Sequence, residues 1–506
     1  MAVARTFSIA LQGIIGEVVE IEVDISDGLP SYTLLGLPDS ALSESRERVR
    51  SAILNAGLPW PKQRITVSMS PAWLPKSGSH FDLPIAIAIL IAQDVIPRDQ
   101  SLDQTIFMGE LGLNGDLRRV RGVLPSLLAA NRANFRESIL PDLNLHESDA
   151  ITELVHRGFS RLDSVVEYLK SGRYDEPQRS EIHQEALDGG DFSEVAGQQI
   201  AKFAAEIAVT GGHHLFLIGP PGTGKSMIAS RIPTIMPELS PMDALEVSSI
   251  HSLTSDPSTR PPQSRTPPFI APHHTITQPA LIGGGAHGVR PGAISLAHRG
   301  VLFIDEAPEC KAGTLDSLRE PLEKGSVAIS RVTGTISYPA KFLLVLAANP
   351  CPCGKFIGRG VACTCAPVVI KRYGQKISGP LRDRIDIRTG VEAPTRAELV
   401  SEDPAESSAQ VRERVKVARA LASERFAGSD WSLNSEIPPS ALRKRFAARR
   451  EAMAVLHRSL DSQLISARGF HKVLRVAWSI CDLRGGDSPR VDDVERALAM
   501  RIGDSL

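Results

Sequence analysis

The sequence predicts an α/β protein with three successive parts: an N-terminal α/β domain, a phosphate-loop core with a parallel sheet, and a helical C-terminal lid. In residues 1–170, strand-like segments alternate with helical patterns. In the middle of the chain, apolar runs with the length of buried strands precede a glycine-rich loop and an acidic pair. Residues 395–506 consist of helical patterns. This order predicts a polar linker at 171–194 and a core at 195–394.

The composition is that of a globular protein with a balanced charge. Its 506 residues are enough for about three domains. There are 57 Lys and Arg residues against 58 Asp and Glu residues, so a site for a polyanion has to be local. The N-terminal apolar run is too short to span a bilayer, and no later run reaches the roughly 18 apolar residues that a span needs. We therefore expect a cytoplasmic protein without a membrane partner.

The N-terminal part predicts a mixed α/β domain. Strand composition occurs at 18–26, 31–37 and 64–71, and a helical pattern at 39–57 ends at a glycine. Residues 81–93 are apolar nearly all round, which indicates a buried helix.

Two segments of this domain resemble the proteolytic domain of Lon proteases, which has a ribosomal S5-like fold. They are KSGSHFDLPIAIA, from Lys76, and FMGELGLNGDLRRVRGVLPSLLAANRA, residues 107–133. In the aligned positions His80 replaces the nucleophilic serine, and Leu124 replaces the general-base lysine. Ser79 is one residue away, but no lysine stands in for Leu124. The resemblance therefore implies a Lon-like scaffold that lacks the Ser/Lys dyad and is not an active protease.

Residues 195–212 predict a helix that leads from the linker into the core. Its first residues, VAGQ, are similar to a VxGQ segment that covers the adenine in related ATPases. This similarity implies Val195 and Gln198 as base contacts. The alternative is that the segment is only the packed start of a helix.

The glycine-rich loop GPPGTGKS fits the phosphate-loop pattern GxxxxGK[ST], with a strand-like run before it and a helical segment after it. Glycines let the loop N–H groups and the helix N-terminus point at phosphate oxygens. Lys225 would contact the β and γ phosphates, and Ser226 would bind Mg²⁺. The pattern therefore predicts ATP and Mg²⁺ as cofactors. The predicted nucleotide-binding residues are Gly219, Pro220, Pro221, Gly222, Thr223, Gly224, Lys225 and Ser226.

The segment VLFIDE, residues 301–306, predicts a buried strand with two carboxylates at its carboxyl end. Asp305 would bind Mg²⁺ through Ser226 and water, and Glu306 would polarise the attacking water. Upstream, His273 and His274 are adjacent. Because neighbouring side chains usually point in different directions, we expect them in a structural or pore-facing loop rather than in a metal site.

After a helical pattern, residues 327–342 predict a hairpin with its tip at Thr333 and Gly334. Residues 342–349 predict a further buried strand, which ends at the polar Asn349.

Four cysteines follow in CPCGKFIGRGVACTC, residues 351–365. Four thiolates satisfy tetrahedral Zn²⁺, and the glycine-rich connection allows the two pairs to fold together. The spacing predicts a zinc site formed by Cys351, Cys353, Cys363 and Cys365. The alternative is four reduced cysteines without a metal.

The helical tail contains the one locally basic stretch of the chain, residues 440–475. Its basic residues are candidate phosphate contacts, although a solvated helix face is equally consistent with the pattern. The candidates are Arg443, Lys444, Arg445, Arg449 and Arg450.

Four longer motifs carry a sharper resemblance. They are APHHxxxxxALIGGG, PGxISLAHxGVLFIDE, LAANPCPCG and SGPLxDRIDI, between residues 271 and 387. Together with the Lon-like front and the helical tail, they identify the chain, over its whole length, as a member of the ComM/YifB family of magnesium-chelatase-like AAA+ ATPases.

The resemblance implies roles for three further residues. Asn349 takes the sensor 1 position, from which it would hydrogen-bond the attacking water or the γ phosphate. Arg384 takes the position of the arginine finger, which reaches the nucleotide of the neighbouring subunit. Arg468 takes the sensor 2 position, with Arg475 as the second choice. For Arg384, the alternative is a local ion pair with Asp383 or Asp386.

The resemblance also implies partners and a function. A finger supplied in trans requires a homo-oligomer, and hexameric rings are usual in the family. The hairpin at 327–342 would enter the ring pore and contact DNA, with Arg331 and Thr333 as candidate contacts. The alternative is a hairpin that simply packs on the sheet.

The implied function is that of an ATP-dependent DNA motor, a branch-migration helicase that acts on recombination intermediates in natural transformation. The alternatives are a chelatase-like or protein-remodelling AAA+ ATPase that does not act on DNA. We expect the ATPase subunits of magnesium chelatase to lack the front domain, which weighs against a chelatase.

Overall fold

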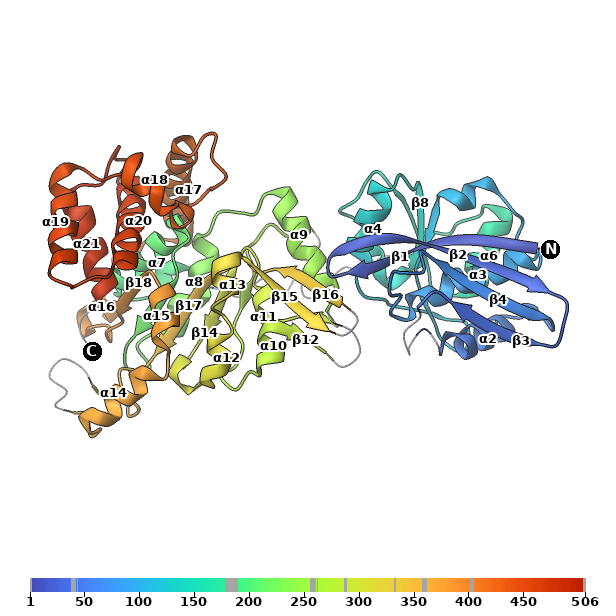
Figure 1. The fold of residues 1–506 in the computed structure, drawn as a ribbon, viewed down its shortest axis with the longest axis horizontal. Helices are drawn as coiled ribbons and strands as arrows, with labels where there is room; N and C mark the ends of the chain where they lie inside the picture. The colour runs from blue at the N-terminus through green and yellow to red at the C-terminus, as the bar shows by residue number, and fades with distance from the viewer. Residues whose placement is uncertain are drawn as a thin grey trace.

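The computed structural model describes residues 2–37, 42, 44–177, 190–254, 261, 263–285, 289–331, 334–356, 362–400 and 405–503. The molecule is elongated, with the N-terminal part at one end and the C-terminal helices at the other (Figure 1). Between them lies the parallel sheet of the core. The fold is therefore α/β, with an N-terminal mixed sheet, a parallel core and a helical C-terminal region.

The N-terminal sheet has seven strands in the order β3-β4-β2-β1-β5-β8-β9. The β1–β2 and β2–β4 pairs are antiparallel, and the other neighbours are parallel. In β2, Val19, Ile21 and Val23 are fully buried on one face, as the period of two along a strand requires. The strands are β1 (Ala2–Gln12), β2 (Ile15–Ser26), β3 (Ser31–Leu35), β4 (Arg64–Ser70), β5 (Thr105–Phe107), β8 (Glu137–Pro141) and β9 (Val155–Phe159).

Helices cover this sheet. Helix α3 (Asp82–Ala92) is buried at every position, which confirms the buried helix that its apolar sequence predicts. It packs on β1 and β2. The remaining helices of this part are α2 (Ser45–Asn55), α4 (Val123–Arg132), α5 (Leu145–Ser148) and α6 (Leu162–Ser171), and a short hairpin is formed by β6 (Glu110–Leu111) and β7 (Leu117–Arg118).

The core sheet has five parallel strands in the order β11-β14-β17-β10-β18. All residues of β14 and β17 are buried, which accounts for their continuous apolar runs. The strands are β10 (Leu215–Ile218), β11 (Phe269–Ile270), β14 (Val301–Ile304), β17 (Leu343–Ala348) and β18 (Ile387–Gly390). The helices around the sheet include α7 (Gln199–Gly211), α8 (Lys225–Ile235), α9 (Pro241–Ser252), α14 (Pro367–Gln375) and α15 (Gly379–Arg384).

The predicted hairpin is present. Strands β15 (Ser326–Arg331) and β16 (Gly334–Pro339) pair in antiparallel fashion and form a sheet of their own, separate from the core sheet. Its base is fixed by the bond from the Ala340 N–H to the Gly325 carbonyl, 2.9 Å long. The short helix α13 (Pro321–Lys324) directly precedes β15.

The C-terminal region is helical, as predicted. Helix α17 packs on α7 and α8, and α20 packs on α7, so one hydrophobic cluster joins this region to the core. Its helices are α16 (Arg396–Val400), α17 (Ser408–Arg425), α18 (Pro439–Lys444), α19 (Arg450–Asp461), α20 (Ala467–Leu483) and α21 (Val491–Ile502).

The N-terminal part contacts the core at two places. Helix α4 lies against α9, where the Gly122 N–H donates to the Ser252 carbonyl over 2.9 Å and the Ser252 hydroxyl donates to Glu147. The turn between β1 and β2 lies against β16, and a Cβ at Gly13 would be only 2.9 Å from the Ser337 carbonyl oxygen. The front sheet therefore rests both on a core helix and on the hairpin (Figure 1).

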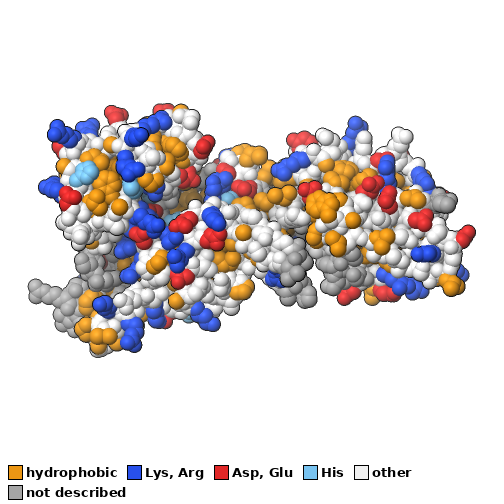
Figure 2. All heavy atoms as spheres, viewed as in Figure 1, with side chains coloured by type: hydrophobic (Ala, Val, Ile, Leu, Met, Phe, Trp, Pro, Cys, Tyr) orange, Lys and Arg blue, Asp and Glu red, His pale blue; other side chains and the backbone are white. Residues whose placement is uncertain are grey.

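Basic and acidic side chains are interspersed over the face shown in Figure 2, consistent with the balanced composition. Among the helices that the structure describes, none is long and apolar enough to cross a membrane.

Candidate nucleotide-binding site

The phosphate loop, the acidic pair and Asn349 lie together because β10, β14 and β17 are parallel neighbours and each ends in one of them. The loop follows β10, Asp305 and Glu306 follow β14, and Asn349 follows β17. The carboxyl edge of a parallel sheet is the usual place for a ligand. The structure thus brings together the residues that the motifs single out separately.

The backbone of the loop needs its glycines. Gly222 and Gly224 have φ angles of 76° and 90°, in the left-handed region that glycine adopts at little cost. A Cβ at Gly219 would overlap the Val391 carbonyl oxygen of the neighbouring chain segment. The Thr223 hydroxyl donates to the Pro220 carbonyl over 2.9 Å and closes the turn.

Lys225 is folded into this loop, with only 7% of its surface exposed. Its ammonium donates to the carbonyls of Gly219 and Pro220, both at 2.7 Å, and to the Asn349 side-chain oxygen at 3.2 Å. Burial lowers the pKa of Lys225, while the carboxylates of Asp305 and Glu306 act in the opposite direction. The cation is therefore positioned beside the sensor candidate and within the field of both acids.

The donor set beside Lys225 fits a magnesium ion bound with a nucleotide. The Ser226 hydroxyl donates to Asp305 Oδ2 over 2.6 Å, and the Glu306 N–H donates to Asp305 Oδ1 over 2.8 Å. A hydroxyl and a carboxylate are hard oxygen ligands of the kind that Mg²⁺ prefers. Ser226 and Asp305 would hold the ion and its waters.

Glu306 has a contact that the sequence analysis did not anticipate. Its φ of 48° is left-handed, and its Oε2 lies 3.2 Å from Nδ1 of His274. His273 instead bonds Thr275, with 2.8 Å between Nδ1 and Oγ1. His274 therefore contacts the nucleotide site through Glu306. Only the acid type of Glu306 and its place after the strand could be seen in the sequence, because its partner lies on a different loop.

The two candidate base contacts differ in their surroundings. The Gln198 amide donates to the Thr223 carbonyl over 3.0 Å and to the Glu392 carbonyl, which places it directly beside the phosphate loop. Val195 is buried in the hydrophobic core at the start of α7. Gln198 thus lies at the site. Val195 packs in the core, in agreement with the alternative that this segment is only the packed start of a helix.

Arg384 lies at the opposite edge of the sheet. It ends α15, before β18, whereas the phosphate loop follows β10, and these two strands pair in parallel from Leu215 with Ile387 to Ile218 with Gly390. Its guanidinium forms an ion pair with Glu323 and donates to the Pro380 carbonyl over 2.8 Å. The structure therefore replaces the expected alternative partners, Asp383 and Asp386, with Glu323, which no local sequence signal marks.

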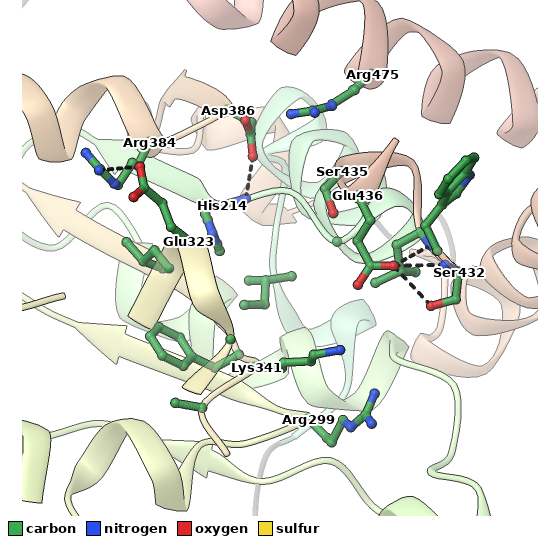
Figure 3. A pocket seen from close by; sticks show the side chains of 18 of the residues that line it. His214, Arg299, Glu323, Lys341, Arg384, Asp386, Ser432, Ser435, Glu436 and Arg475 are labelled. Atoms are coloured by element: carbon green, nitrogen blue, oxygen red, sulfur yellow. Dashed lines mark hydrogen bonds and ion pairs between the residues drawn. The ribbon is translucent and has the colours of Figure 1, made fainter. Parts of the chain in front are cut away.

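This edge is hollowed by a cleft of about 960 Å³ between the core and the helical region (Figure 3). Arg468 also lines the cleft, and its side chain is 76% exposed. Its Nη1 lies 3.6 Å from Oδ2 of Asp383. Arg475 donates to the Ile437 carbonyl over 2.9 Å. Both sensor 2 candidates thus lie with Arg384 at the amino edge of the sheet and away from the phosphate loop of their own chain.

A buried ion pair fixes the floor of this cleft. The Lys472 ammonium on α20 donates to Asp386 Oδ1 over 2.7 Å, and the His214 N–H donates to the other carboxylate oxygen over 3.2 Å. Burial alone would raise the pKa of Asp386, but the Lys472 ammonium and the neighbouring histidines lower it well below its usual value. The pair joins the helical region to the start of β18.

The four clustered cysteines fit a metal ion. Their sulfur atoms all lie within 4.8 Å of one another, and the described distances are 3.3 Å from Cys351 to Cys353, 3.7 Å from Cys351 to Cys363 and 3.6 Å from Cys353 to Cys363. Ligands at about 2.3 Å from a tetrahedral Zn²⁺ would be about 3.8 Å apart. All four are free thiols, and backbone N–H donation from Lys355 lowers the pKa of Cys353 to about 6.

Two further sets of candidate contacts are solvent-exposed. Arg331 is exposed at the end of β15, while Thr333 lies outside the described residues. The five basic residues of the lid are also exposed: Arg443, Lys444, Arg445, Arg449 and Arg450. Arg445 donates to the Arg425 carbonyl over 3.0 Å, so part of this basic face is tied to the lid.

In the front domain, the positions aligned with the Lon dyad hold no such pair. His80 Nε2 lies 2.9 Å from the Ile9 carbonyl oxygen, and Leu124 is buried in a hydrophobic cluster. Ser79 donates to Glu110, whose carboxylate gives the hydroxyl an acidic partner instead of a lysine.

Comparison with family models accounts for most of the chain. Models described as magnesium chelatase subunit ChlI match residues 21–144 and 191–399, and a model of the C-terminal part of the same subunit matches residues 405–501. The front domain therefore carries the same subunit description as the core. The 38 kDa magnesium-chelatase subunit of Rhodobacter capsulatus is 26% identical over only 42% of this chain, so the expectation that chelatase ATPase subunits lack the front domain stays a prediction.

Full-length relatives extend this likeness. An uncharacterized protein of Mycobacterium tuberculosis is 44% identical over 99% of both chains. The competence protein ComM of Haemophilus influenzae is 39% identical over 99% of this chain and 98% of its own. The protein YifB of Escherichia coli is 39% identical over 100% of this chain and 98% of its own.

Proposed function

This chain belongs to the ChlI-like family of magnesium chelatase, with full-length homologues named ComM and YifB, and on that premise we propose that it is an ATP-driven, ring-forming DNA motor. Its load would be branched recombination intermediates, whose branches it would migrate during natural transformation. The observation that carries this proposal is the 39% sequence identity with a competence protein over 99% of this chain and 98% of that protein. Membership of the family identifies the chain as a chelatase-like AAA ATPase, independently of the molecule on which it acts.

The carboxyl edge of the core sheet supplies the groups for ATP hydrolysis. ATP with Mg²⁺ would bring the phosphoryl group to be transferred. Lys225 is placed to neutralise charge on the phosphates, and Ser226 with Asp305 is placed to hold the ion. Glu306 would orient the attacking water, and Asn349, 3.2 Å from Lys225, would hydrogen-bond the same water or the γ phosphate.

The position of Arg384 supports an assembly of several subunits. Four residues of β10 separate the phosphate loop from the edge where Arg384 lies, a span of roughly 13 Å of strand. The guanidinium therefore cannot stabilise the phosphates of its own subunit, and it would serve the next subunit across an interface. Arg468, at the same edge, would act across the same interface. We propose a hexamer.

The hairpin β15–β16 supports DNA as the load. It forms its own two-stranded sheet rather than extending the core sheet, and Arg331 near its tip is exposed. A projecting hairpin in a ring can contact a strand in the pore, and Arg331 would meet phosphates there. Thr333 is proposed to lie beside it.

We propose that the four cysteines hold one Zn²⁺. Their sulfur separations fit a tetrahedral site, which the ion would close without an open position for catalysis. The front domain would be a Lon-like, ribosomal S5-like scaffold, in which Ser79 donates to the carboxylate of Glu110 and lacks the lysine that a Ser/Lys dyad uses as its general base.

The test is ATP-dependent dissociation of a synthetic four-way DNA junction by wild type and by Lys225→Ala. We expect the wild type to separate the junction into duplex arms and the variant to be inactive, because the variant lacks the phosphate-binding cation. Hydrolysis of ATP without DNA stimulation and without junction dissociation would overturn the DNA motor and favour a protein-remodelling ATPase. Metalation of a porphyrin by the wild type would favour a chelatase.

A further inference from the structure

The cysteine cluster lies beside the nucleotide site and begins directly after it in the sequence. Cys351 follows Asn349 by one intervening residue and is fully buried. Helix α14 begins two residues after Cys365. The metal-binding segment therefore leaves the sheet directly behind the sensor position and continues into a helix that returns to the site.

The first contact from this segment is with the phosphate loop. Gly354, one residue after Cys353, packs on the ring of Pro221, and a Cβ at Gly354 would be 2.5 Å from Pro221 Cδ. Its φ of 73° is also in the left-handed region. Pro221 directly precedes Gly222 in the phosphate loop, so the position of Gly354 limits where that loop can lie.

The second contact is with Asn349. Tyr373 on α14 is buried, and its hydroxyl lies near the Asn349 backbone, which opposes the rise in the pKa of Tyr373 that burial causes. The third is with the segment that follows the acidic pair, since α14 packs against the turn Ala307–Glu309 and Lys376 pairs with Glu309 at 3.0 Å. The segment that carries the four cysteines and continues into α14 thus lies against the phosphate loop, Asn349 and the turn after the acidic pair.

From this convergence we infer that the metal held by the four cysteines locks the geometry of the ATP site, so that nucleotide affinity and turnover depend on metal occupancy. The inference rests on the proposed zinc site and on ATP hydrolysis, but not on DNA. Without the metal, no covalent bond joins the two described cysteine pairs, because all four are free thiols. Gly354 and Tyr373 would then be held to the site only by their own contacts.

The first experiment separates the metal from the contact that transmits its effect. Gly354→Ala places a methyl group against Pro221 while leaving all four cysteines, so we expect one zinc per chain and an affinity for fluorescent mant-ATP weakened by roughly tenfold. Gly374→Ala on α14 is the matched control, because a Cβ there meets open space. It should leave zinc content and mant-ATP affinity unchanged.

The second experiment uses Tyr373→Phe, which removes only the hydroxyl that lies near the Asn349 backbone. We expect retained zinc, unchanged mant-ATP affinity and a kcat for ATP lowered by about tenfold. In the wild type, chelation of the metal should weaken mant-ATP binding, and added Zn²⁺ should restore it.

The outcomes are distinguishable because no DNA is present and metal content is measured first. A wild type that is isolated without zinc overturns the metal site itself. A zinc-bound Gly354→Ala protein with wild-type affinity, or a metal-depleted wild type with unchanged affinity, overturns the lock while leaving the metal site intact. If Gly354→Ala also loses zinc, the Tyr373→Phe variant is the deciding test. A zinc-bound Tyr373→Phe protein with the kcat of the wild type would then refute the lock.

Discussion

The ammonium of Lys225 has three acceptors within hydrogen-bond distance, and all three belong to the site. Two are loop carbonyls and the third is the Asn349 side chain. When the nucleotide binds, phosphate oxygens would replace some of these acceptors, which already hold the ammonium in position. Such an arrangement costs little reorganisation when the nucleotide binds, because the donor is already in place.

For Glu306 we predict that a single substitution separates ATP hydrolysis from ATP binding. Glu306→Gln keeps the shape of the side chain but removes the carboxylate that would orient water, so kcat should fall by roughly 10²–10⁴-fold with ATP still bound. Single-turnover phosphate release and retention of labelled ATP measure the two effects. Glu320→Gln is the control, since Glu320 forms only an exposed pair with Lys324. Normal turnover in Glu306→Gln would refute the assignment.

Residues within a contiguous motif could be predicted from the sequence, and their partners on other segments could not. Lys225 and Ser226 are fixed by local spacing, and Asp305 by its place after an apolar strand. The contacts of Glu306 with His274 and of Arg384 with Glu323 join segments that only the folded chain brings together. No periodicity or propensity encodes such pairs.

Among the elements, α20 is joined to the core strand β18 by the buried pair of Lys472 and Asp386. The folded pKa of Asp386 lies well below its ordinary value, so its ionised form contributes stability above about pH 4. That contribution is lost as the pH falls towards the folded pKa, because the unfolded chain takes up the proton first. The helical region is thus anchored most firmly at neutral pH.

Lys472→Met should therefore loosen α20, by about 3 kcal/mol of local opening free energy, because it leaves a buried carboxylate uncompensated. Hydrogen exchange of α20 peptides at neutral pH measures this change. The deficit should shrink on acidification, as Asp386 becomes protonated. Lys324→Met, which breaks an exposed pair, should change exchange little. Equal protection of α20 in Lys472→Met and wild type would contradict the anchor.

Elements with a strong periodic signal could be predicted, whereas short ones could not. Helix α3 is apolar all round and is buried throughout, and β14 and β17 are apolar runs that became central strands. The strand β5 has three residues and β11 has two, too few for a pattern to emerge. They form because neighbouring strands offer hydrogen-bond partners, which is a tertiary effect.

At the scale of the whole molecule, the site is divided between the two edges of one sheet. The phosphate loop lies at one edge and Arg384 at the other, so a complete site would need two chains. Lys225→Ala and Arg384→Ala should each be inactive alone. Mixed in equal amounts, they should regain ATPase activity, because about one quarter of the interfaces in a random ring would pair an intact loop with an intact finger.

The measurement is ATP hydrolysis after the two variants are mixed under conditions that allow subunit exchange. A mixture of two separately prepared Lys225→Ala samples is the control and should stay inactive. Activity in Arg384→Ala alone, or no recovery in the mixture, would contradict a finger supplied in trans.

The close approach of Gly13 to Ser337 has a mechanical consequence. At Gly13 there is no room for a side chain between the β1–β2 turn and the hairpin, so in the proposed ring the hairpin could not advance along the pore independently. Each stroke of the proposed motor would have to carry the front domain with it or break this contact. The front domain would then oppose movement of the hairpin, through a contact that is far from the bound ATP.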